Sequence, residues 1–396
     1  MSDPYVLTWH KSASEIDQAA WNKVYEGQSV VKLHAFTKSV ESSALEGVDY
    51  SYLQVSTDSG TVALVSCFQF EVDLDVLAPE PVRRAVALVR RRFPSFLRLT
   101  LFFVGSPVAT CENHVGVDLN KVAEEDIATL GQRIFEALSA KSAEHSCFLS
   151  IVKELPTSET VLFRAMFGDQ FKLFPSLPTS RIPLLAPSHP YPSILRRSYR
   201  KRFKKALAES EKSDLSWNFV SNYGKMTSEL YDLYFQVYSK STNKFEKLTE
   251  QFFASLAATM PSDSFALTCR QPDGSLIAAC ILIEDEFRMI PLYIGLDYAA
   301  TEGTTVYYNV LFRSVLEAER RGKRCVVLGQ TSYLAKAYSG AVFESLNLGL
   351  HSTSRLGRFL IRWVFSLLFR NVELPPTVHN DDIKHDVAFE AACQFK

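Results

Sequence analysis

Polar side chains follow an apolar run in the last quarter of the chain, in the segment CVVLGQTSYLAKAYSGA. Gly329, Gln330 and Thr331 come directly after the predicted buried strand 325–328. Tyr333 and Lys336 are three residues apart, so they share one face of the short helix expected there. Because strand ends in open α/β sheets line ligand sites, we expect these side chains to point into one cleft. The alternative is that Lys336 is a surface lysine and Tyr333 a packing residue.

The segment ATEGTTVYYNVLFRSVLEAERRG predicts a second feature, a long helix whose start follows a strand. The first N–H groups of a helix have no partner within it, and such a helix start can hold an anion or an acyl oxygen. Gly303 lets a ligand approach the backbone, and Thr304 or Thr305 can cap the helix. Tyr307 and Tyr308 lie near this end. An ordinary cap with core aromatics fits the pattern equally well.

A third feature is a dense run of positive charge, ILRRSYRKRFKKALAESEK. Its apolar residues recur at helical spacing, and the rest of the helix surface is basic. Four of these basic residues are candidates for a phosphate-bearing donor: Arg200, Arg202, Lys204 and Lys205. Such a donor could be coenzyme A or the acceptor end of a transfer RNA, since Arg pairs bidentately with phosphate. The alternative is a solvated face balanced by the acidic residues downstream.

Two α/β lobes are expected to position these features. A Pro-rich stretch, 183–193, separates two runs in which strands and helices alternate. Each run contains helices, a hairpin with an Asp-X-Gly or Asp-Gly turn, a buried strand, a helix and a further strand. We therefore predict lobes at 1–185 and 186–370 with an acidic tail at 371–396. The repetition is one of pattern and not of residues.

Composition limits the classes of function. The formal net charge is −1, so any polyanion site must be local and DNA is not an expected partner. The seven cysteines are scattered without a CxxC pair, which predicts a reducing compartment and no metal site. Neither a signal-peptide pattern nor a long uncharged apolar run is present, and we expect a cytoplasmic protein. Walker, GxGxxG, HExxH and GxSxG motifs are absent from the sequence.

The stretch from YIGLDYAATEGTTVYYN to VVLGQTSYLAKAYSGA, with ILRRSYRKRFKKAL and FFVGSPVATCENHVGVD upstream, resembles the FemAB-like branch of the GNAT acyltransferase superfamily. That branch has two tandem GNAT lobes, and the likeness covers most of the chain. It implies an N-acyltransferase that joins an activated acyl group to an amine, with the donor in the second lobe and the acceptor between the lobes. The [QR]xxGx[GA] pyrophosphate loop of ordinary GNAT enzymes is missing, and only Gly303 stands there.

Roles follow from that resemblance. Lys336 matches the lysine that supports the reacting ester and would stabilise charge on the carbonyl or leaving oxygen. Tyr333 would donate a proton, and Gln330 and Thr331 would orient the acyl group or the amine. Asp297 or Glu302 could accept the amine proton, and a water chain would serve as well.

No bound cofactor is expected, and the co-substrate would be acyl-CoA, an acyl-carrier-protein thioester or an aminoacyl-tRNA. We expect the acceptor to be the amine of a small molecule or an amino acid. One alternative is an aminoacyl-tRNA-dependent transferase with tRNA as partner. The other is a non-catalytic GNAT-fold scaffold, in which side chains would fill the cleft.

Two further segments leave alternatives open. Cys111 and His114 in CENH could suggest a cysteine nucleophile, but a structural or cleft-lining cysteine is favoured. The segment 358–370 is apolar and Arg-rich, so it could lie on a membrane surface. We favour instead a helix that covers the second lobe.

Overall fold

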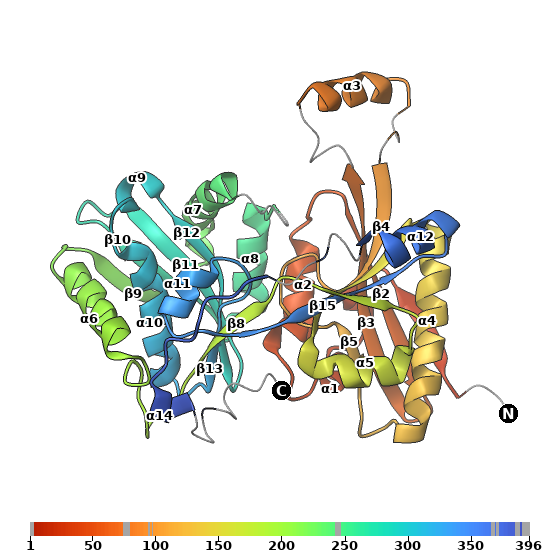
Figure 1. Cartoon of the computed structure of the whole chain (residues 1–396), viewed down its shortest axis with the longest axis horizontal. Coiled ribbons are helices and arrows are strands. Elements are labelled where there is room, and N and C mark those ends of the chain that lie inside the picture. Colours follow the sequence, from red (N-terminus) through yellow and green to blue (C-terminus); the bar gives the residue numbers. More distant parts are fainter. Residues whose placement is uncertain are drawn as a thin grey trace.

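The computed structural model of the chain contains two mixed β-sheets that lie side by side, each flanked by helices (Figure 1). It describes residues 4–73, 80–93, 96, 98–241, 247–365, 369, 372–384 and 389. Within these residues, no helix has the length and apolar character needed to cross a bilayer.

The first sheet has the strand order β1-β2-β3-β4-β6-β15-β7, with β5 paired to β3. The hairpin predicted at Asp58-Ser59-Gly60 joins β2 to β3. The strands are β1 (Val6–His10), β2 (Val48–Thr57), β3 (Gly60–Asp73), β4 (Arg98–Val104), β5 (Val115–Val117), β6 (Leu149–Pro156), β15 (Leu346–His351) and β7 (Lys172–Pro175).

The second sheet has the order β14-β8-β13-β12-β11-β10-β9. Its strands are β14 (Val342–Glu344), β8 (Thr179–Pro183), β13 (Cys325–Val327), β12 (Arg288–Leu296), β11 (Leu276–Glu284), β10 (Ser264–Arg270) and β9 (Ser216–Val220). Residues of β10 and β11 are buried along almost their whole length, as expected of a sheet covered on both faces.

Among the described residues, each sheet contains one parallel pair of strands whose connection includes helix. In the first sheet β4 pairs with β6 after α4 (Ile127–Glu144). In the second sheet β12 pairs with β13 after α9 (Tyr298–Thr301) and α10 (Val306–Arg320). The predicted mixed α/β fold with two similar lobes is therefore confirmed.

Strands are exchanged between the lobes. β8 follows β7 in the chain but joins the second sheet, whereas β15 follows β14 but joins the first. As a result, the segments 176–178 and 345 pass between the two sheets next to each other, and the Ser176 N–H donates to the Leu346 carbonyl at 2.8 Å. The N–H and hydroxyl of Thr157 both donate to the Ser345 carbonyl, at 3.2 and 2.7 Å. The division at residues 1–185, 186–370 and 371–396 stays a prediction.

Helices from both lobes share one core. α7 (Thr227–Lys240) and α8 (Glu250–Thr259) cover one face of the second sheet, and α2 (His34–Ser42) of the first lobe packs on α8. The Thr249 hydroxyl donates to the Ser43 carbonyl at 2.7 Å across this contact. The two lobes are therefore held together by apolar packing as well as by the exchanged strands.

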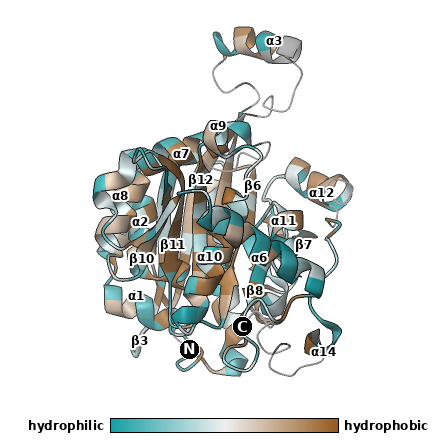
Figure 2. Cartoon of the chain, turned by 90° about the vertical axis from the view of Figure 1, so that its left-hand side faces the viewer, coloured by the Kyte–Doolittle hydropathy of each residue, from teal (hydrophilic) through white to brown (hydrophobic). Residues whose placement is uncertain are grey.

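The opposite face of the second sheet carries α10 and α6 (Arg197–Glu211), with Phe203 of α6 against Phe312 of α10. Figure 2 shows α6 largely hydrophilic on its outer side and the strands behind it hydrophobic. The remaining helices are α1 (Gln18–Val24), α3 (Glu80–Arg90), α5 (Thr160–Phe167), α11 (Tyr333–Tyr338), α12 (Arg355–Trp363) and α14 (Asp381–Lys384).

The helix expected to cover the second lobe is α12, and that prediction is wrong. α12 contacts β15, and its Ile361 packs with Leu149, Phe174 and Leu350 of the first sheet. The reason is the strand exchange, because β15 returns the chain to the first sheet just before α12 begins. The periodicity of the segment predicts the helix but not the partner it packs on.

Candidate functional site

Four residues with left-handed backbone meet where the lobes join. Thr331 (φ 61°) and Ser332 (φ 49°) follow β13, while Cys111 (φ 61°) and Glu154 (φ 52°) come from the first lobe. An ideal Cβ placed on Gly329 would lie 3.8 Å from the Cys111 sulfur, which shows how closely these segments approach. Non-glycine residues in this conformation are strained and are concentrated at functional sites. We call this group of segments the junction wall.

Lys336 is the buried cation of the junction wall. Its side chain is 6% exposed, and Nζ donates to the Gln330 carbonyl oxygen at 2.5 Å. Burial lowers the pKa of Lys336 to about 8. The amine can therefore be charged or neutral close to physiological pH, a property that acid–base and charge-stabilising roles require.

The two other predicted catalytic side chains contact the segment that crosses between the sheets. Gln330 Nε2 donates to the Leu177 carbonyl at 2.8 Å, and the Tyr333 hydroxyl donates to the Pro178 carbonyl at 3.0 Å. Partial burial raises the pKa of Tyr333. The structure thus places Gln330, Tyr333 and Lys336 together, with the backbone at Thr331 between them.

Glu154 connects the junction wall to the first lobe. Its Oε2 accepts hydrogen bonds from the backbone N–H groups of Thr110 and Cys111, at 3.0 and 2.8 Å, and from the Thr110 hydroxyl at 3.2 Å. Burial raises the pKa of the Cys111 thiol to about 12, and His114 bonds to Thr110 with its own pKa lowered to about 3. The structure therefore favours the structural interpretation of Cys111, because a thiol with this pKa is not a thiolate at neutral pH.

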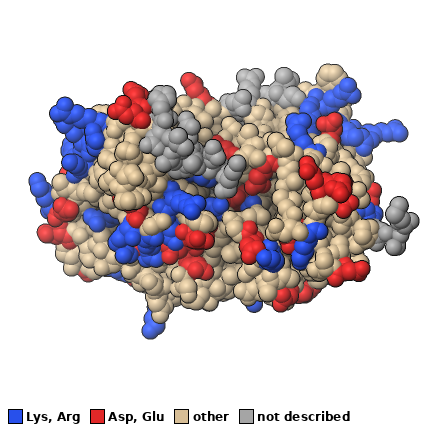
Figure 3. Space-filling model, turned by 90° about the horizontal axis from the view of Figure 1, so that it is seen from below, with Lys and Arg blue, Asp and Glu red and all other residues tan. Residues whose placement is uncertain are grey.

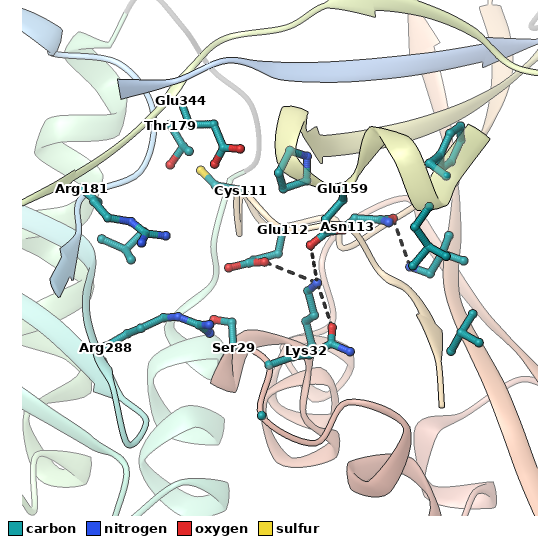
Figure 4. A pocket seen from close by; sticks show the side chains of 18 of the residues that line it. Ser29, Lys32, Cys111, Glu112, Asn113, Glu159, Thr179, Arg181, Arg288 and Glu344 are labelled. Carbon is teal, nitrogen blue, oxygen red and sulfur yellow. Dashed lines mark hydrogen bonds and ion pairs between the residues drawn. The ribbon is translucent and has the colours of Figure 1, made fainter. Parts of the chain in front are cut away.

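A cavity of about 230 Å³ lies between the lobes on one side of the junction wall, and we call it the interlobe cavity (Figure 4). Cys111 forms part of its surface. From the first lobe it is lined by Ser29, Lys32, the loop around Glu112 and α5, and from the second by β8, β12, β13 and β14.

Charges of both signs line the interlobe cavity. Lys32 Nζ lies 3.4 Å from both Glu112 and Glu159 on the first-lobe side. Arg181 and Arg288 extend from the second lobe on the opposite side (Figure 4). Burial lowers the pKa of Arg181, which interacts favourably with Glu112 and Glu344.

Only one of the two carboxylate oxygens of Glu344 is hydrogen-bonded within the described part of the chain. Oε1 accepts from the Ser158 N–H and hydroxyl at 3.2 and 2.9 Å, whereas Oε2 is buried and has no hydrogen-bond partner in the described part of the chain. Burial raises the pKa of Glu344. A more basic carboxylate beside Cys111 and Thr179 in this cavity is suited to accept a proton or an ammonium group.

The predicted donor helix start is α10. The Thr304 hydroxyl accepts from Val306 N at 3.3 Å, while Thr305, the residue before the helix, makes no side-chain cap. Gly303 has φ 73° and open space around an added Cβ, so a ligand could approach its backbone. Asp297 caps the neighbouring α9 through the N–H groups of Ala299 and Ala300. It lines neither the interlobe cavity nor the junction wall.

Tyr307 and Tyr308 lie on the first turn of α10, with ring centroids 5.8 Å apart. Burial raises the pKa of Tyr307 to about 12, and its hydroxyl interacts with Ser332. Tyr307 therefore links the start of α10 to the junction wall.

The basic residues of α6 are mostly solvent-exposed. Arg202 lies 4.5 Å over the Tyr338 ring of α11, and Arg200 donates to the Ser193 carbonyl at 3.2 Å. Lys205 pairs with Glu209 at 3.6 Å, and Lys204 is exposed. Asn309 of α10 donates to the Ala206 carbonyl at 2.9 Å, so α6 and the start of α10 are adjacent. On the face seen from below, basic and acidic side chains are interspersed (Figure 3).

Among the described residues, no group of three or more His, Cys, Asp or Glu side chains could hold a metal ion.

Comparison with known families gives one match. Residues 196–336 match the acetyltransferase (GNAT) domain family, and this range contains the basic helix, α10 and Lys336. Most of the predicted second lobe is therefore similar to a GNAT acetyltransferase domain. The match supports an acyltransferase activity for this part of the chain and agrees with the resemblance found in its sequence. No curated protein matches it in sequence.

Solved structures with a similar fold span both lobes. FemX has a TM-score of 0.56 at 11% identity, and the match covers 91% of this chain and 99% of that one. The C-terminal domain of a protein assigned as a lysylphosphatidylglycerol synthetase, from Agrobacterium fabrum, gives 0.53 at 12%, covering 88% and 95%. L-PGS from Bacillus licheniformis gives 0.50 at 10%, covering 89% and 96%. At these identities the likeness is one of fold.

The sequence alone did not single out three side chains of this candidate site. Glu154 sits within an apolar strand, Arg181 within the extended stretch FKLFPSLPTSRIPL, and Glu344 between the short helix expected at Tyr333 and Lys336 and the helix predicted at 358–370. Only Arg181 carried a visible signal, because a lone arginine within a buried strand needs partners.

Proposed function

We propose that the protein transfers an acyl group from a thioester to the amine of an amino-acid-like acceptor held in the interlobe cavity. The observation that carries this proposal is the separation of charge there. Arg181 and Arg288 line the second-lobe side, and Glu344 presents an unpartnered carboxylate oxygen. A cavity with both signs suits a molecule that carries both an ammonium and a carboxylate group.

The chemistry requires few groups. The acceptor ammonium gives its proton to Glu344, whose raised pKa makes it a stronger base than an ordinary glutamate. The neutral amine nitrogen attacks the acyl carbonyl carbon and an amide C–N bond forms as the C–S bond breaks. The second proton of the amine passes to the departing sulfur, so the products are the amide and the free thiol. Lys336 has a pKa of about 8, so it is charged below that pH. Its charge offsets the negative charge that develops on the carbonyl oxygen and the leaving group.

An aminoacyl-tRNA donor is the second candidate, and the exposed basic side of α6 favours it. Arg202, Lys204 and Lys205 lie on a helix that contacts the start of α10. The same cations could bind the phosphates of coenzyme A. The non-catalytic alternative predicts a filled cleft around Gln330, Tyr333 and Lys336. Gln330 lines a cavity of about 360 Å³, whereas Tyr333 and Lys336 line neither this cavity nor the interlobe cavity.

The test is product analysis by mass spectrometry. The protein is incubated with acyl-CoA thioesters and, separately, with charged tRNA, in the presence of amino acids and of the corresponding amino-acid amides. The proposal predicts an N-acyl amino acid, and about tenfold or greater preference for the free acid over the amide, since a carboxylate gains charged hydrogen bonds to arginine.

Arg181→Gln should remove most of that preference, whereas Arg133→Gln on the outer surface of α4 should not. If an amide product forms only with charged tRNA, the donor is an aminoacyl-tRNA and not a thioester. Equal use of acids and amides by the unaltered protein would refute the acceptor assignment.

A further inference from the structure

A second cavity, of about 360 Å³, lies on the other side of the junction wall. We call it the apolar cavity. Its described lining residues are Phe103, Ala109, Leu149, Ile151, Lys153, Glu154, Ser176, Leu177, Gln330, Leu348, Leu350, Phe365 and Phe369. The volume falls within the usual range for ligand pockets, and it is more than twice the roughly 150 Å³ cavity that admits benzene.

The polar residues of the apolar cavity are turned to other partners. Lys153 Nζ donates to the Ser106 carbonyl at 2.7 Å and lies 5.7 Å from the Phe68 ring centroid. Glu154 Oε2 is bonded to Thr110 and Cys111, as described above. What remains on the lining is hydrocarbon from β4, β6, β15 and the two phenylalanines. The ligand that such a surface favours is apolar, since each buried CH₂ contributes about 0.8 kcal/mol.

The polar end of the apolar cavity lies at the junction wall. Gln330 and Glu154 line this cavity, the Gln330 carbonyl holds the Lys336 amine, and Glu154 holds the backbone of Cys111. Cys111 lines the interlobe cavity on the other side. A chain in the apolar cavity with its carboxyl end at Gln330 would therefore present its carbonyl group next to Lys336 and the acceptor cavity.

We propose that the apolar cavity holds the hydrocarbon chain of the acyl donor, so that the protein selects medium-chain rather than acetyl groups. This inference rests on the proposed function and specifies its acyl class. The chain lies among Ile151, Leu348 and Leu350, and the thioester carbonyl lies at Gln330. The amine then approaches from the interlobe cavity, and the two substrates meet at the junction wall.

The test is calorimetric binding of decanoate and butyrate to the whole protein. Decanoate should bind at least about tenfold more tightly than butyrate, because its longer chain buries more apolar area. Ala109→Phe places a ring in the cavity and should abolish the difference. Ala123→Phe, on the exposed surface of the same lobe, is the matched control and should retain it.

Leu348→Trp fills the cavity from β15 and gives an independent variant should Ala109→Phe fail to fold. Equal binding of the two acids, or decanoate binding that survives both filling variants, overturns the inference. The two proposals fail separately. Decanoate binding without amide product refutes the proposed function, whereas an acetylated product without decanoate binding refutes the acyl-chain cavity.

A different observation carries a second inference, on the outer side of α12. The exposed fractions of Leu356, Phe359 and Trp363 are 60%, 56% and 60%, although α12 packs on the first sheet through Gly357 and Ile361. The exposed arginines alternate with these residues; they are Arg355, Arg358 and Arg362. Aromatic and aliphatic side chains flanked by arginine are typical of helices that lie in a membrane interface.

A second element on the same side of the molecule has the same composition. α3 lies above the first lobe, on the side that also carries α12 (Figures 1 and 2). At the end of α3 and just after it, Leu88 and Phe93 are each 61% exposed, and the neighbouring side chains of residues 90–92 are arginines. Together the two elements provide apolar groups that can insert and cations that attract anionic head groups.

We infer that α12 and α3 bind the surface of an anionic membrane. Sedimentation with vesicles of phosphatidylcholine, with and without phosphatidylglycerol, tests this. The protein should sediment only with the anionic vesicles, and less so as salt rises. Phe359→Ser with Trp363→Ser should abolish sedimentation, while Phe219→Ser, exposed on β9 of the second lobe, should not. Failure to bind anionic vesicles, or binding that the double variant retains, contradicts the inference.

Discussion

Replacing Lys336 by methionine should change how stability depends on pH. In the folded protein, burial lowers the pKa of Lys336 from its usual 10.5 to about 8. Between these two values the unfolded chain holds a proton that the folded chain has released, so the free energy of unfolding of the unaltered protein rises with pH. Lys336→Met lacks this contribution.

The size of the effect follows from the two pKa values. Integrated from about pH 7 to about pH 10, the contribution of Lys336 amounts to about 2.5 kcal/mol, at roughly 1.4 kcal/mol per pKa unit. The variant also loses the bond from Nζ to the Gln330 carbonyl. Leaving a buried carbonyl unpaired costs about 1–3 kcal/mol, but this cost does not vary with pH. The slope therefore isolates the buried amine.

The measurement is urea unfolding of both proteins at several pH values, followed by circular dichroism. The difference in unfolding free energy, unaltered protein minus variant, should grow by about 2.5 kcal/mol over that pH range. Lys225→Met, at an exposed lysine, controls for the loss of one lysine. Parallel pH profiles for the unaltered protein and Lys336→Met would refute the claim that this amine is buried and destabilised in its charged form.

Three further changes test separate parts of the structure. Glu344→Gln should lower the rate of acyl transfer by about 10²-fold or more, because it removes the proposed base. It should also remove the loss of rate that the unaltered enzyme shows as pH falls through the raised pKa of Glu344. A rate–pH profile checks both effects, and an unchanged acid limb of that profile contradicts the role of Glu344 as base. Cys111→Ala should leave the rate of acyl transfer within a few-fold of that of the unaltered protein, because the thiol, with a pKa of about 12, forms no covalent intermediate. Loss of activity in a correctly folded variant would contradict this structural interpretation of Cys111. Gly131→Ala should destabilise the first lobe by about 1–3 kcal/mol or more, since the new Cβ on α4 would lie 2.0 Å from the Met166 carbonyl oxygen of α5. An unchanged thermal melting temperature would contradict this, because it would show that α4 and α5 can separate at little cost.

The sequence predicts the elements well where local patterns determine them. The Asp58-Ser59-Gly60 turn, the buried strand before Gln330 and the amphipathic α10 all follow from periodicity and turn chemistry. Placing α12 required knowledge of the strand exchange, which depends on pairing between residues far apart in the chain. β15 and β6, for example, are separated by almost two hundred residues, and no local signal records their pairing.

The site was predictable only on the second-lobe side. Gln330, Tyr333 and Lys336 were expected together because they follow one strand, and the structure places them together at the junction wall. Their roles stay predictions. Glu154 and Glu344 reach the same place from other strands, so their proximity depends on tertiary structure. Asp297 shows the converse, since its position after a strand is explained by capping α9.

The most direct test of the central claim, that an acyl chain and an amine meet at the junction wall, is a single competition experiment. The protein receives an equimolar mixture of acetyl-CoA and decanoyl-CoA with an amino-acid mixture, and the amide products are quantified by mass spectrometry for the unaltered protein, Ala109→Phe and Lys336→Met. The structure predicts mainly decanoyl amides from the unaltered protein, a shift toward acetyl amides in Ala109→Phe, and little product of either kind in Lys336→Met. Acetyl amides alone from the unaltered protein, or undiminished product in Lys336→Met, would contradict it.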